Sequence, residues 1–197
     1  FDHYYSDAAF DAALPYIFAS SPTKLYDVGG NTGKWALRCC RYDDKVAVTI
    51  LDLPQQIALA QDNIAKAGLS HRIGFHTVDM LSHSTLPGDA DVWWMSQFLD
   101  CFSPEQIVAM LTRVAQAMKP GAQLCIMELF WDAQKFEAAS FSLNATSLYF
   151  TCMANGNSRF YSVEKFSHYL EMAGFRIEKR LDNLGVGHTL LVCQKIE

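Results

Sequence analysis

The sequence predicts an α/β domain with a mostly parallel sheet, helices on both faces, and one antiparallel strand near the end of the chain. Short hydrophobic runs alternate with helical segments of about a dozen residues, which is typical of a parallel sheet covered on both sides. The last two hydrophobic runs are joined only by the short connection from Asp182 to Gly187. So short a connection permits antiparallel pairing and excludes a parallel crossover.

Turn residues divide the first half of the chain into strands and helices. A glycine-rich turn over 29–33 ends the first strand, and Pro54 occupies a typical first position of a helix that Gly68 ends. The run 46–51 is rich in β-branched residues, as strands are. We therefore expect strands over 24–28, 46–51 and 72–78, and helices over 34–41 and 55–67.

The second half is divided in the same way. Ser103 and Pro104 form an N-cap followed by a proline at the first helical position, and Lys119-Pro120-Gly121 ends that helix. Ser162 caps a later helix that Gly174 ends. We expect strands over 92–95, 122–127, 175–181 and 188–195, and helices over 104–118, 136–154 and 163–173.

Composition excludes several classes of protein. The 16 basic and 21 acidic residues give a net charge of −5 without a basic stripe, which argues against a nucleic-acid partner. No apolar run reaches the 18 residues that suggest a membrane span. The six cysteines have no C-x-x-C spacing, which is typical of free thiols in a reducing, cytoplasmic compartment. Half of the residues are apolar, enough for the core of one domain.

Polar or glycine-rich residues follow every strand of the predicted parallel sheet. Ligands of such sheets bind beyond the carboxyl ends of the strands, near the point where the strand order reverses. The sequence therefore predicts a ligand site at this edge. The residues that follow the five strands are Gly29 to Gly33, Asp52, Asp79 with Met80, Ser96 to Asp100, and Glu128.

The first two of these features indicate an adenosine-type ligand. Glycines allow a tight turn and a close approach of a ligand to the backbone. Asn31 stands where a dinucleotide-binding G-x-G-x-x-G would have its second glycine, yet asparagine tolerates the left-handed region. Asp52 lies about twenty residues further on, where a carboxylate accepts hydrogen bonds from ribose hydroxyls. The alternatives are a plain strand-to-helix turn and a carboxylate that stabilises a helix N-terminus.

A set of motifs in this order resembles a known family. The motifs D-V-G-G-N-T-G at 27–33, I-L-D-L-P at 50–54, V-D-M at 78–80 and K-P-G at 119–121 resemble S-adenosylmethionine-dependent methyltransferases. More closely, they are similar to the catalytic domain of small-molecule O-methyltransferases of the caffeic acid and acetylserotonin type. The resemblance implies a Rossmann-like class I methyltransferase fold with seven strands, covering nearly the whole chain.

The resemblance also implies how S-adenosylmethionine would be held. Gly29, Gly30 and Gly33 would cradle its methionine part, while Asp27 holds the N–H groups of the loop. The remaining cofactor contacts implied are Asp52 and Leu53 at the ribose and one adenine face, Asp79 and Met80 at the adenine, and Ser96 and Gln97 beside the sulfonium. No metal is expected.

The catalytic positions depart from the pattern of the family. In the plant enzymes the residue that matches Asp100 is a histidine that acts as general base. Glu128 matches the first of two glutamates that flank this histidine, but the second falls near Phe160 and is missing. Asp100 serves as a base if burial beside Glu128 raises its pKa; otherwise it orients the acceptor, or the acceptor ionises easily. His188, at the start of the last strand, is a second candidate, with an ordinary structural histidine as the alternative.

The acceptor pocket is expected to come from the apolar helix over 136–154. Phe141, Asn144 and Leu148 recur there at helical spacing, and the alternative is that this stripe belongs to the core. The aromatic stretch from Phe1 to Tyr5 is a candidate lid. A flat aromatic acceptor suits such surroundings.

The sequence thus predicts methyl transfer from S-adenosylmethionine to a hydroxyl of a small aromatic molecule. The alternative is a partner or regulatory subunit that binds the cofactor without strong activity. We expect residues 1–20 to be a helical lead-in and 21–197 to be the methyltransferase domain. The chain begins without methionine, so we also expect that it is cut from a longer, homodimeric protein whose N-terminal dimerisation domain is absent here.

Overall fold

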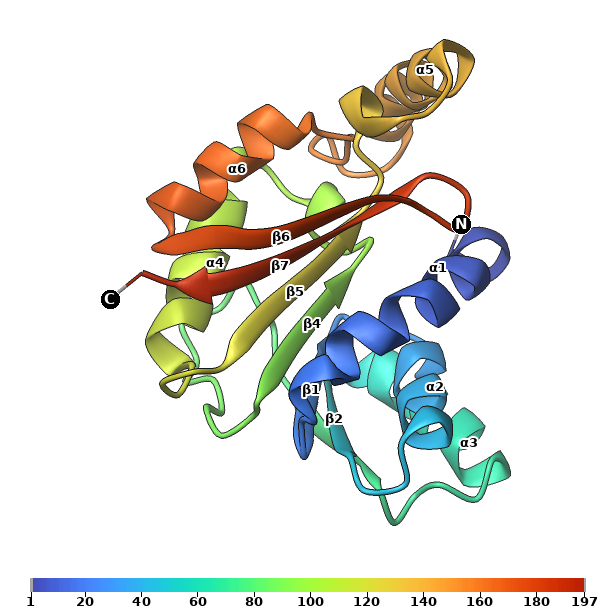
Figure 1. Ribbon diagram of the computed structural model, residues 1–197, viewed down its shortest axis with the longest axis vertical. Coiled ribbons are helices and arrows are strands. Elements are labelled where there is room, and N and C mark those ends of the chain that lie inside the picture. Colours follow the sequence, from blue (N-terminus) through green and yellow to red (C-terminus); the bar gives the residue numbers. More distant parts are fainter. Residues whose placement is uncertain (1, 197) are drawn as a thin grey trace.

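A computed structural model describes residues 2–196; of Asp2 to Tyr5 only the backbone is described. Seven strands form one sheet in the order β3-β2-β1-β4-β5-β7-β6 (Figure 1). The first five run parallel, and β7 is antiparallel to both of its neighbours. The strands are β1 (Lys24–Val28), β2 (Ala47–Asp52), β3 (Ile73–Thr77), β4 (Val92–Ser96), β5 (Gln123–Glu128), β6 (Phe175–Leu184) and β7 (His188–Lys195).

The helices divide between the two faces of the sheet, and each face has its own hydrophobic core. The core beneath α1 to α3 contains Trp94 and the core beneath α4 and α6 contains Trp93, because consecutive residues of β4 point to opposite faces. The predicted fold is therefore confirmed. The helices are α1 (Asp2–Ile17), α2 (Lys34–Tyr42), α3 (Pro54–Lys66), α4 (Pro104–Ala117), α5 (Glu137–Met153) and α6 (Val163–Met172), with short 3-10 helices η1 (Phe18–Ser20), η2 (Leu99–Cys101) and η3 (Trp131–Ala133).

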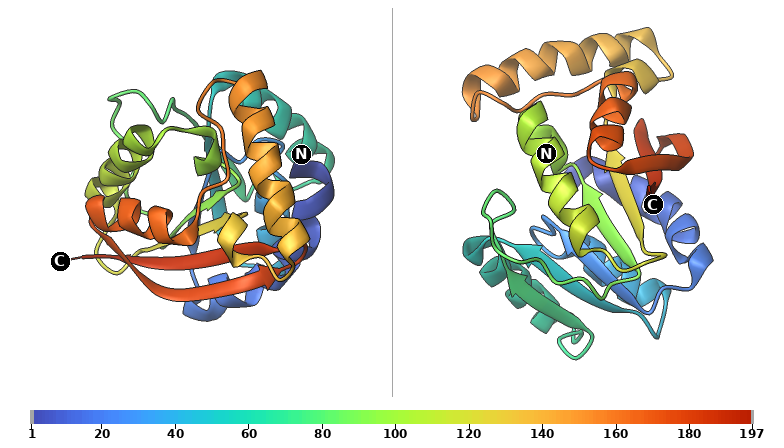
Figure 2. Two further views of the ribbon diagram at one scale, coloured as in Figure 1. Left: turned by 90° about the horizontal axis from the view of Figure 1, so that it is seen from above. Right: turned by 90° about the vertical axis from the view of Figure 1, so that its left-hand side faces the viewer.

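Helix α5 differs from the other helices because it belongs to neither layer. It lies across one end of the molecule in the right-hand view of Figure 2, and none of its residues is fully buried. Two side chains on its inner side fasten it to the following segment: Ser147 accepts from the N–H of Phe160, and Thr151 donates to the carbonyl of Ser158. The sequence predicted this helix almost to the residue.

The hairpin between β6 and β7 is tighter than predicted. Strand β6 continues to Leu184, so Gly185 to Gly187 alone connect the two strands. Asp182 and Asn183 are turn formers and therefore signalled an earlier end, but a register shift and a left-handed Asn183 (φ 59°) accommodate them within the strand. The Asp182 carboxylate accepts a hydrogen bond from Thr189 of β7 at 2.9 Å, which fixes the pairing.

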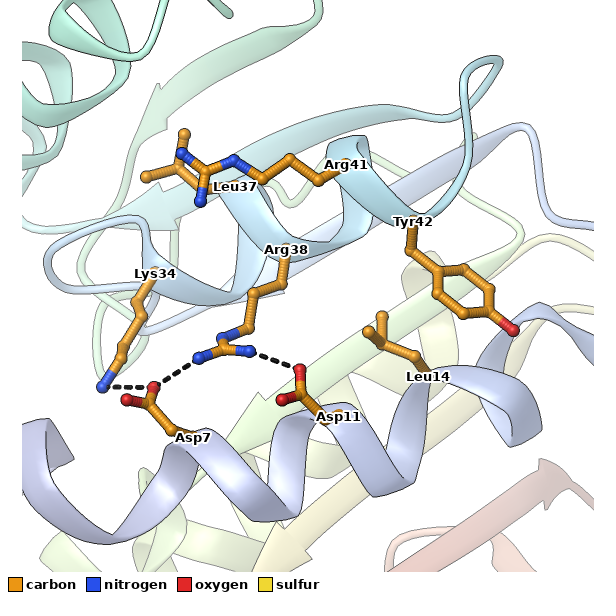
Figure 3. A pocket seen from close by; sticks show the side chains of 8 residues that line it. All are labelled: Asp7, Asp11, Leu14, Lys34, Leu37, Arg38, Arg41 and Tyr42. Carbon is orange, nitrogen blue, oxygen red and sulfur yellow. Dashed lines mark hydrogen bonds and ion pairs between the residues drawn. The ribbon is translucent and has the colours of Figure 1, made fainter.

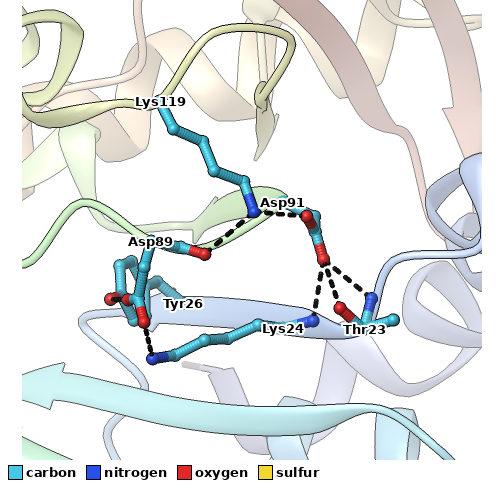
Figure 4. Close-up of polar contacts among 6 residues, drawn as sticks. All are labelled: Thr23, Lys24, Tyr26, Asp89, Asp91 and Lys119. Carbon is cyan, nitrogen blue, oxygen red and sulfur yellow. Dashed lines mark hydrogen bonds and ion pairs between the residues drawn. The ribbon is translucent and has the colours of Figure 1, made fainter.

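A polar network fastens the edge of the sheet at which β1 and β4 begin (Figure 4). One carboxylate oxygen of Asp91 accepts bonds from the N–H groups of Thr23 and Lys24 at 2.8 and 2.9 Å. Its other oxygen pairs with Lys119 at 2.6 Å. These contacts lower the pKa of Asp91 against the opposing effect of burial. The network lies at the edge opposite the predicted ligand site and has a structural role.

Candidate active site

The polar residues predicted to form the site lie along one edge of the sheet. Strands β1 and β4 are neighbours, and the chain leaves them in different directions, to β2 and to β5. Their carboxyl ends therefore form the switch point at which α/β sheets bind ligands. Because β7 runs antiparallel, it brings its first residue, His188, to the same edge.

The glycine-rich turn after β1 is shaped for close contact with a ligand. Gly29 and Gly33 have φ of 70° and 77°, and Asn31, as expected, also occupies the left-handed region at 48°. A Cβ at Gly29 would overlap the ring of Phe98, and a Cβ at Gly30 would lie 2.7 Å from an oxygen of the buried Asp27 carboxylate. Only glycine fits these two positions, so the backbone at Gly29 and Gly30 stays uncovered by side chains of its own.

Asp52, at the end of β2, joins this turn to the next helix. Its Oδ2 accepts from the N–H of Asn31 at 2.9 Å and its Oδ1 accepts from the N–H of Leu53 at 2.8 Å. Burial raises the pKa of this carboxyl more than these two bonds lower it. Leu53 begins α3 with an exposed side chain. A carboxylate and an apolar side chain therefore lie together beside the turn.

The segment after β3 is held by its own turn and by α4. The Asp79 carboxylate accepts from the N–H of Leu81 at 2.8 Å. Arg113 donates to the carbonyls of Met80 and Ser84, both at 2.6 Å. The side chain of Met80 is buried in the core, so this segment presents mainly backbone and the Asp79 carboxylate to the edge.

Ser96 and Gln97 end β4 at the switch point. The Ser96 hydroxyl is buried and has no hydrogen-bond partner among residues 2–196. Gln97 adopts a left-handed conformation with φ of 47°, which is unusual for glutamine. Its side-chain Nε2 lies 3.0 Å from the Nε2 of His188. Because the glutamine nitrogen is a donor, His188 Nε2 is the acceptor in this pair.

Two carboxyl groups, those of Asp100 and Glu128, form the acidic part of the site. Oε1 of the buried Glu128 accepts from the N–H groups of Phe98 and Leu99, both at 3.0 Å. Burial raises the pKa of Glu128 well above its ordinary value, and the nearby Asp100 charge raises it further. Burial likewise raises the pKa of Asp100 to about 6. Two interacting carboxyl groups thus share one end of the sheet.

His188 is completely buried, with 0% of its surface exposed. Its imidazole contacts the side chain of Gln97, and its surface is covered by the surrounding residues. The structure also shows what occupies the position at which the family has its second glutamate. Phe160 is buried there, so no third carboxylate joins Asp100 and Glu128 from this segment.

A cavity of about 220 Å³ lies between α5, the segment after β5 and the tip of the β6–β7 hairpin. It is the structural candidate for an acceptor pocket, because its wall includes Leu129 beside Glu128 and Val186 near His188. Sequence reasoning missed this combination, because it depends on how the hairpin tip packs. The lining residues are Leu129, Gln134, Ala139, Ser142, Leu143, Thr146, Phe160 and Val186.

The three side chains predicted to contact the acceptor do not line this cavity. Phe141 and Leu148 are 75% and 69% exposed, on the outward face of α5. Asn144 is also exposed, and its side chain donates to the carbonyl of Ser140 one turn earlier. The segment is helical, as predicted. The stripe of α5 that faces the cavity, however, is the neighbouring one, which contains Leu143 and Thr146. The predicted lid begins at Phe1, outside the described residues, and the side chains of 2–5 are likewise not described.

A second cavity, of about 460 Å³, lies between α1 and α2, away from the strand ends (Figure 3). Asp7 of α1 pairs with Lys34 and with Arg38, both at 2.7 Å, and Asp11 also pairs with Arg38. Lys34 directly follows Gly33. These ion pairs therefore hold α1 against the helix that begins at the glycine-rich turn.

The residues at the switch point fit S-adenosylmethionine. The bare backbone of the turn suits a close ligand, Asp52 suits ribose hydroxyls, and the exposed Leu53 suits a flat ring. The buried, unpartnered hydroxyl of Ser96 offers a further polar contact at the same edge. Among the side chains of residues 6–196, no group of three or more histidine, cysteine or acidic residues is arranged to hold a metal ion.

The strand order with its antiparallel β7, together with this turn, defines a class I S-adenosylmethionine-dependent methyltransferase fold. The structure of mitomycin 7-O-methyltransferase MmcR has a TM-score of 0.83 and 23% identity, and the match covers 96% of this chain and 53% of that chain. The O-methyltransferase domain family matches residues 10–176. The chain belongs to this family, whose members use S-adenosylmethionine.

Characterised relatives methylate different acceptors. A 3-hydroxy-5-methyl-1-naphthoate 3-O-methyltransferase of Streptomyces sahachiroi is 31% identical over 64% of this chain and 37% of its own length. Acetylserotonin O-methyltransferase of Gallus gallus is 29% identical over 81% of this chain and 44% of its own length. An L-tyrosine C(3)-methyltransferase of Streptomyces lavendulae is 25% identical over 97% of this chain and 52% of its own length. The chain spans about half the length of such relatives, or less.

Proposed function

We propose that this chain carries the catalytic domain of an enzyme that transfers a methyl group from S-adenosylmethionine to a hydroxyl of a small aromatic molecule. Family membership supports the cofactor and the reaction type. The observation that carries the proposal is the acidic pair Asp100 and Glu128, which lies at the same sheet edge as the glycine-rich turn. A carboxylate there supplies the base that a hydroxyl acceptor requires.

The cofactor supplies a methyl group on a positively charged sulfur, already activated for transfer. The residues of the chain would bind and orient it. Gly29, Gly30 and Gly33 would lie against its methionine part, and Asp27 supports this turn from below. Asp52 would accept from the ribose hydroxyls. Leu53, Asp79 and Met80 would surround the adenine, and Ser96 and Gln97 would lie near the sulfur.

Asp100 would remove the acceptor proton. With a pKa of about 6 it is mostly ionised at neutral pH, yet it is a stronger base than an ordinary aspartate. Burial and the nearby Asp100 charge raise the pKa of Glu128 well above its ordinary value, which favours its protonated form. Since its Oε1 accepts two backbone N–H groups, the proton would reside on Oε2. Glu128 would then stabilise the η2 turn that presents Asp100, without adding a second negative charge.

His188 would act as a positioning residue through Gln97. Gln97 holds a left-handed backbone conformation beside the switch point, and His188 is its side-chain partner. Loss of His188 would therefore disturb the sulfonium end of the site without removing a base.

The cavity beside α5 would hold the body of the acceptor. We place the acceptor there, and not along Phe141, Asn144 and Leu148, because the cavity wall includes Leu129 and Val186. These two residues lie one and two positions from Glu128 and His188 in the sequence. A homodimer of the whole protein and a cytoplasmic location remain predictions. The free cysteines support a reducing compartment, and none of the helices within residues 2–196 is long and apolar enough to cross a membrane.

A second candidate function is a cofactor-binding subunit without strong activity. The aspartate in the histidine position and the phenylalanine at the second glutamate position favour it. Calorimetry with S-adenosylhomocysteine tests what the two functions share: we expect 1:1 binding that Asp52→Ala weakens strongly. Methyl transfer to a panel of phenols then separates them. If the chain turns over a phenol and Asp100→Asn abolishes this turnover, the result supports the methyltransferase function. If the cofactor product binds but no phenol is methylated, the result supports the cofactor-binding subunit.

A further inference from the structure

The cavity beside α5 is lined by uncharged side chains. None of its eight lining residues carries a charge, and five are apolar. A charged ligand would lose its hydration there without finding a counter-charge, which is strongly unfavourable. The three polar lining residues, Gln134, Ser142 and Thr146, therefore decide which uncharged groups the cavity accepts.

The side-chain amide of Gln134 has a fixed orientation. Its Nε2 donates to the carbonyl of Phe130 at 2.8 Å and to the carbonyl of Gly187 at 3.0 Å. Both partners are acceptors only, so the nitrogen must point toward them and the oxygen must point elsewhere. Within residues 6–196, whose side chains are described, no group donates to Oε1. Gln134 thus offers the cavity a hydrogen-bond acceptor with no partner of its own.

Thr146 offers the same chemistry from the other wall. Its hydroxyl donates to the carbonyl of Ser142 one helical turn earlier, at 2.8 Å. Its only hydrogen is therefore used, and the oxygen keeps lone pairs for a ligand. The cavity consequently presents two acceptors in fixed positions. A complementary ligand carries hydrogen-bond donors.

The cavity is partly open to solvent, so its volume sets the size of the part of a ligand that it covers. An apolar cavity of about 150 Å³ holds benzene, so 220 Å³ holds about nine non-hydrogen atoms at the same density. This is one six-membered ring with two or three small substituents.

The walls of the cavity continue directly into the acidic pair. Leu129 follows Glu128 in the sequence. Phe160 follows Arg159, whose N–H donates to the carbonyl of Asp100 at 2.9 Å. A ring held in the cavity therefore lies beside the elements that carry both carboxyl groups.

We propose that the cavity selects an uncharged, single-ring acceptor that carries a second hydrogen-bond donor besides the hydroxyl to be methylated, and that Gln134 recognises this donor. The inference rests on the proposed function, because it treats the cavity as the acceptor subsite. It goes further in naming the chemical class of the acceptor and the residue that selects it.

Binding of small probes, measured by ligand-observed NMR titration on the whole chain, tests the proposal. The probes are 4-methylcatechol with two donors, 4-methylphenol with one, 4-methylanisole with none, and 4-methylbenzoate with a charge. We expect the affinities to fall in this order. Equal affinities for 4-methylcatechol and 4-methylanisole, or tightest binding of 4-methylbenzoate, overturn the proposal.

Two variants test whether the cavity causes the preference for ligands with hydrogen-bond donors. Gln134→Met keeps the length of the side chain and removes the amide, and should weaken 4-methylcatechol binding about two- to tenfold with little effect on 4-methylanisole. Val186→Trp should fill the cavity and abolish binding of every probe. Cys152→Ser, on the exposed side of α5, is the control and should change nothing. A preference that survives both Gln134→Met and Val186→Trp refutes the assignment.

The proposed function is tested separately on the same samples. If S-adenosylhomocysteine does not bind by calorimetry, the proposed function fails, whatever the probes show. If it binds and the probes show no preference for donors, this inference alone fails.

Discussion

Replacement of Asp100 by asparagine removes the proposed base while keeping the size of the side chain. Loss of a general base lowers turnover about 10²- to 10⁴-fold. The pH profile of the unmodified chain gives the sharper test. With a pKa of about 6, Asp100 is about 9% ionised at pH 5 and about 91% ionised at pH 7. Since the base acts in its ionised form, kcat/KM should rise about tenfold between these values.

An ordinary aspartate makes a different prediction. A carboxyl group with a pKa of 3.8 is already about 94% ionised at pH 5, so kcat/KM would hardly change above that pH. The assay is initial-rate methyl transfer to a phenol from pH 4.5 to 8. Asp62→Asn, on the exposed face of α3, is the control and should keep the inflection. A flat profile in an active enzyme, or full activity of Asp100→Asn, would refute the role of Asp100.

The same substitution should make the fold more stable at high pH. The pKa of Asp100 is higher in the folded chain than in the unfolded chain, so the folded state binds more protons between pH 3.8 and about 6. The free energy of unfolding therefore falls as pH rises through this window. Asp100→Asn has no carboxyl group to ionise, and its Tm should exceed that of the unmodified chain at pH 8 but not at pH 4. Higher stability with lost turnover excludes misfolding as the reason for the loss.

Four further substitutions test the scaffold by urea unfolding. Gly29→Ala introduces both left-handed strain and an overlap with the ring of Phe98, while Gly121→Ala introduces only the strain, of about 1–2 kcal/mol. Gly29→Ala should therefore be the more destabilising, and equal losses would contradict the geometry. Asp91→Ala should cost about 1–3 kcal/mol, because it leaves two backbone N–H groups without their acceptor and removes the ion pair with Lys119. Asp7→Ala removes exposed ion pairs and should cost no more than about 1 kcal/mol, with the cost shrinking in high salt.

The sequence predicted the order of elements because turn residues marked most of the boundaries clearly. Ser103 and Pro104 begin α4 with a capping box, and Gly68 and Gly174 follow their helices in left-handed conformations. The end of β6 was predicted too early, because Asp182 and Asn183 resemble a turn when they are considered alone. The hydrogen bond that Thr189 donates to Asp182 forms only when β7 pairs with β6, so the local sequence does not reveal it. Local sequence signals were therefore enough to predict these element boundaries, except at the end of β6, where a contact with a distant strand decides the boundary.

Cofactor and acceptor residues differed in how far they could be predicted. The cofactor residues follow strands directly, so sequence position alone places them at the sheet edge. The acceptor cavity depends on which stripe of α5 faces inward, and α5 has apolar side chains on both sides, such as Leu143 and Leu148. Hydrophobic periodicity cannot choose between two apolar stripes. Gln134 gave no signal, because its role depends on the carbonyl of Gly187, more than fifty residues later.

Under the proposed function, the antiparallel β7 accounts for a fold that holds one cofactor and different acceptors. A parallel strand brings its carboxyl end to the functional edge, but β7 brings its beginning, together with the hairpin that precedes it. Gly185 packs against Ala9 of α1, Gly187 packs against Gln134, and Val186 between them lines the cavity. The glycine-rich turn and Asp52 lie on β1 and β2, on the other side of β4 and β5. Substitutions at this hairpin tip should therefore change which acceptor binds while leaving the affinity for S-adenosylhomocysteine unchanged.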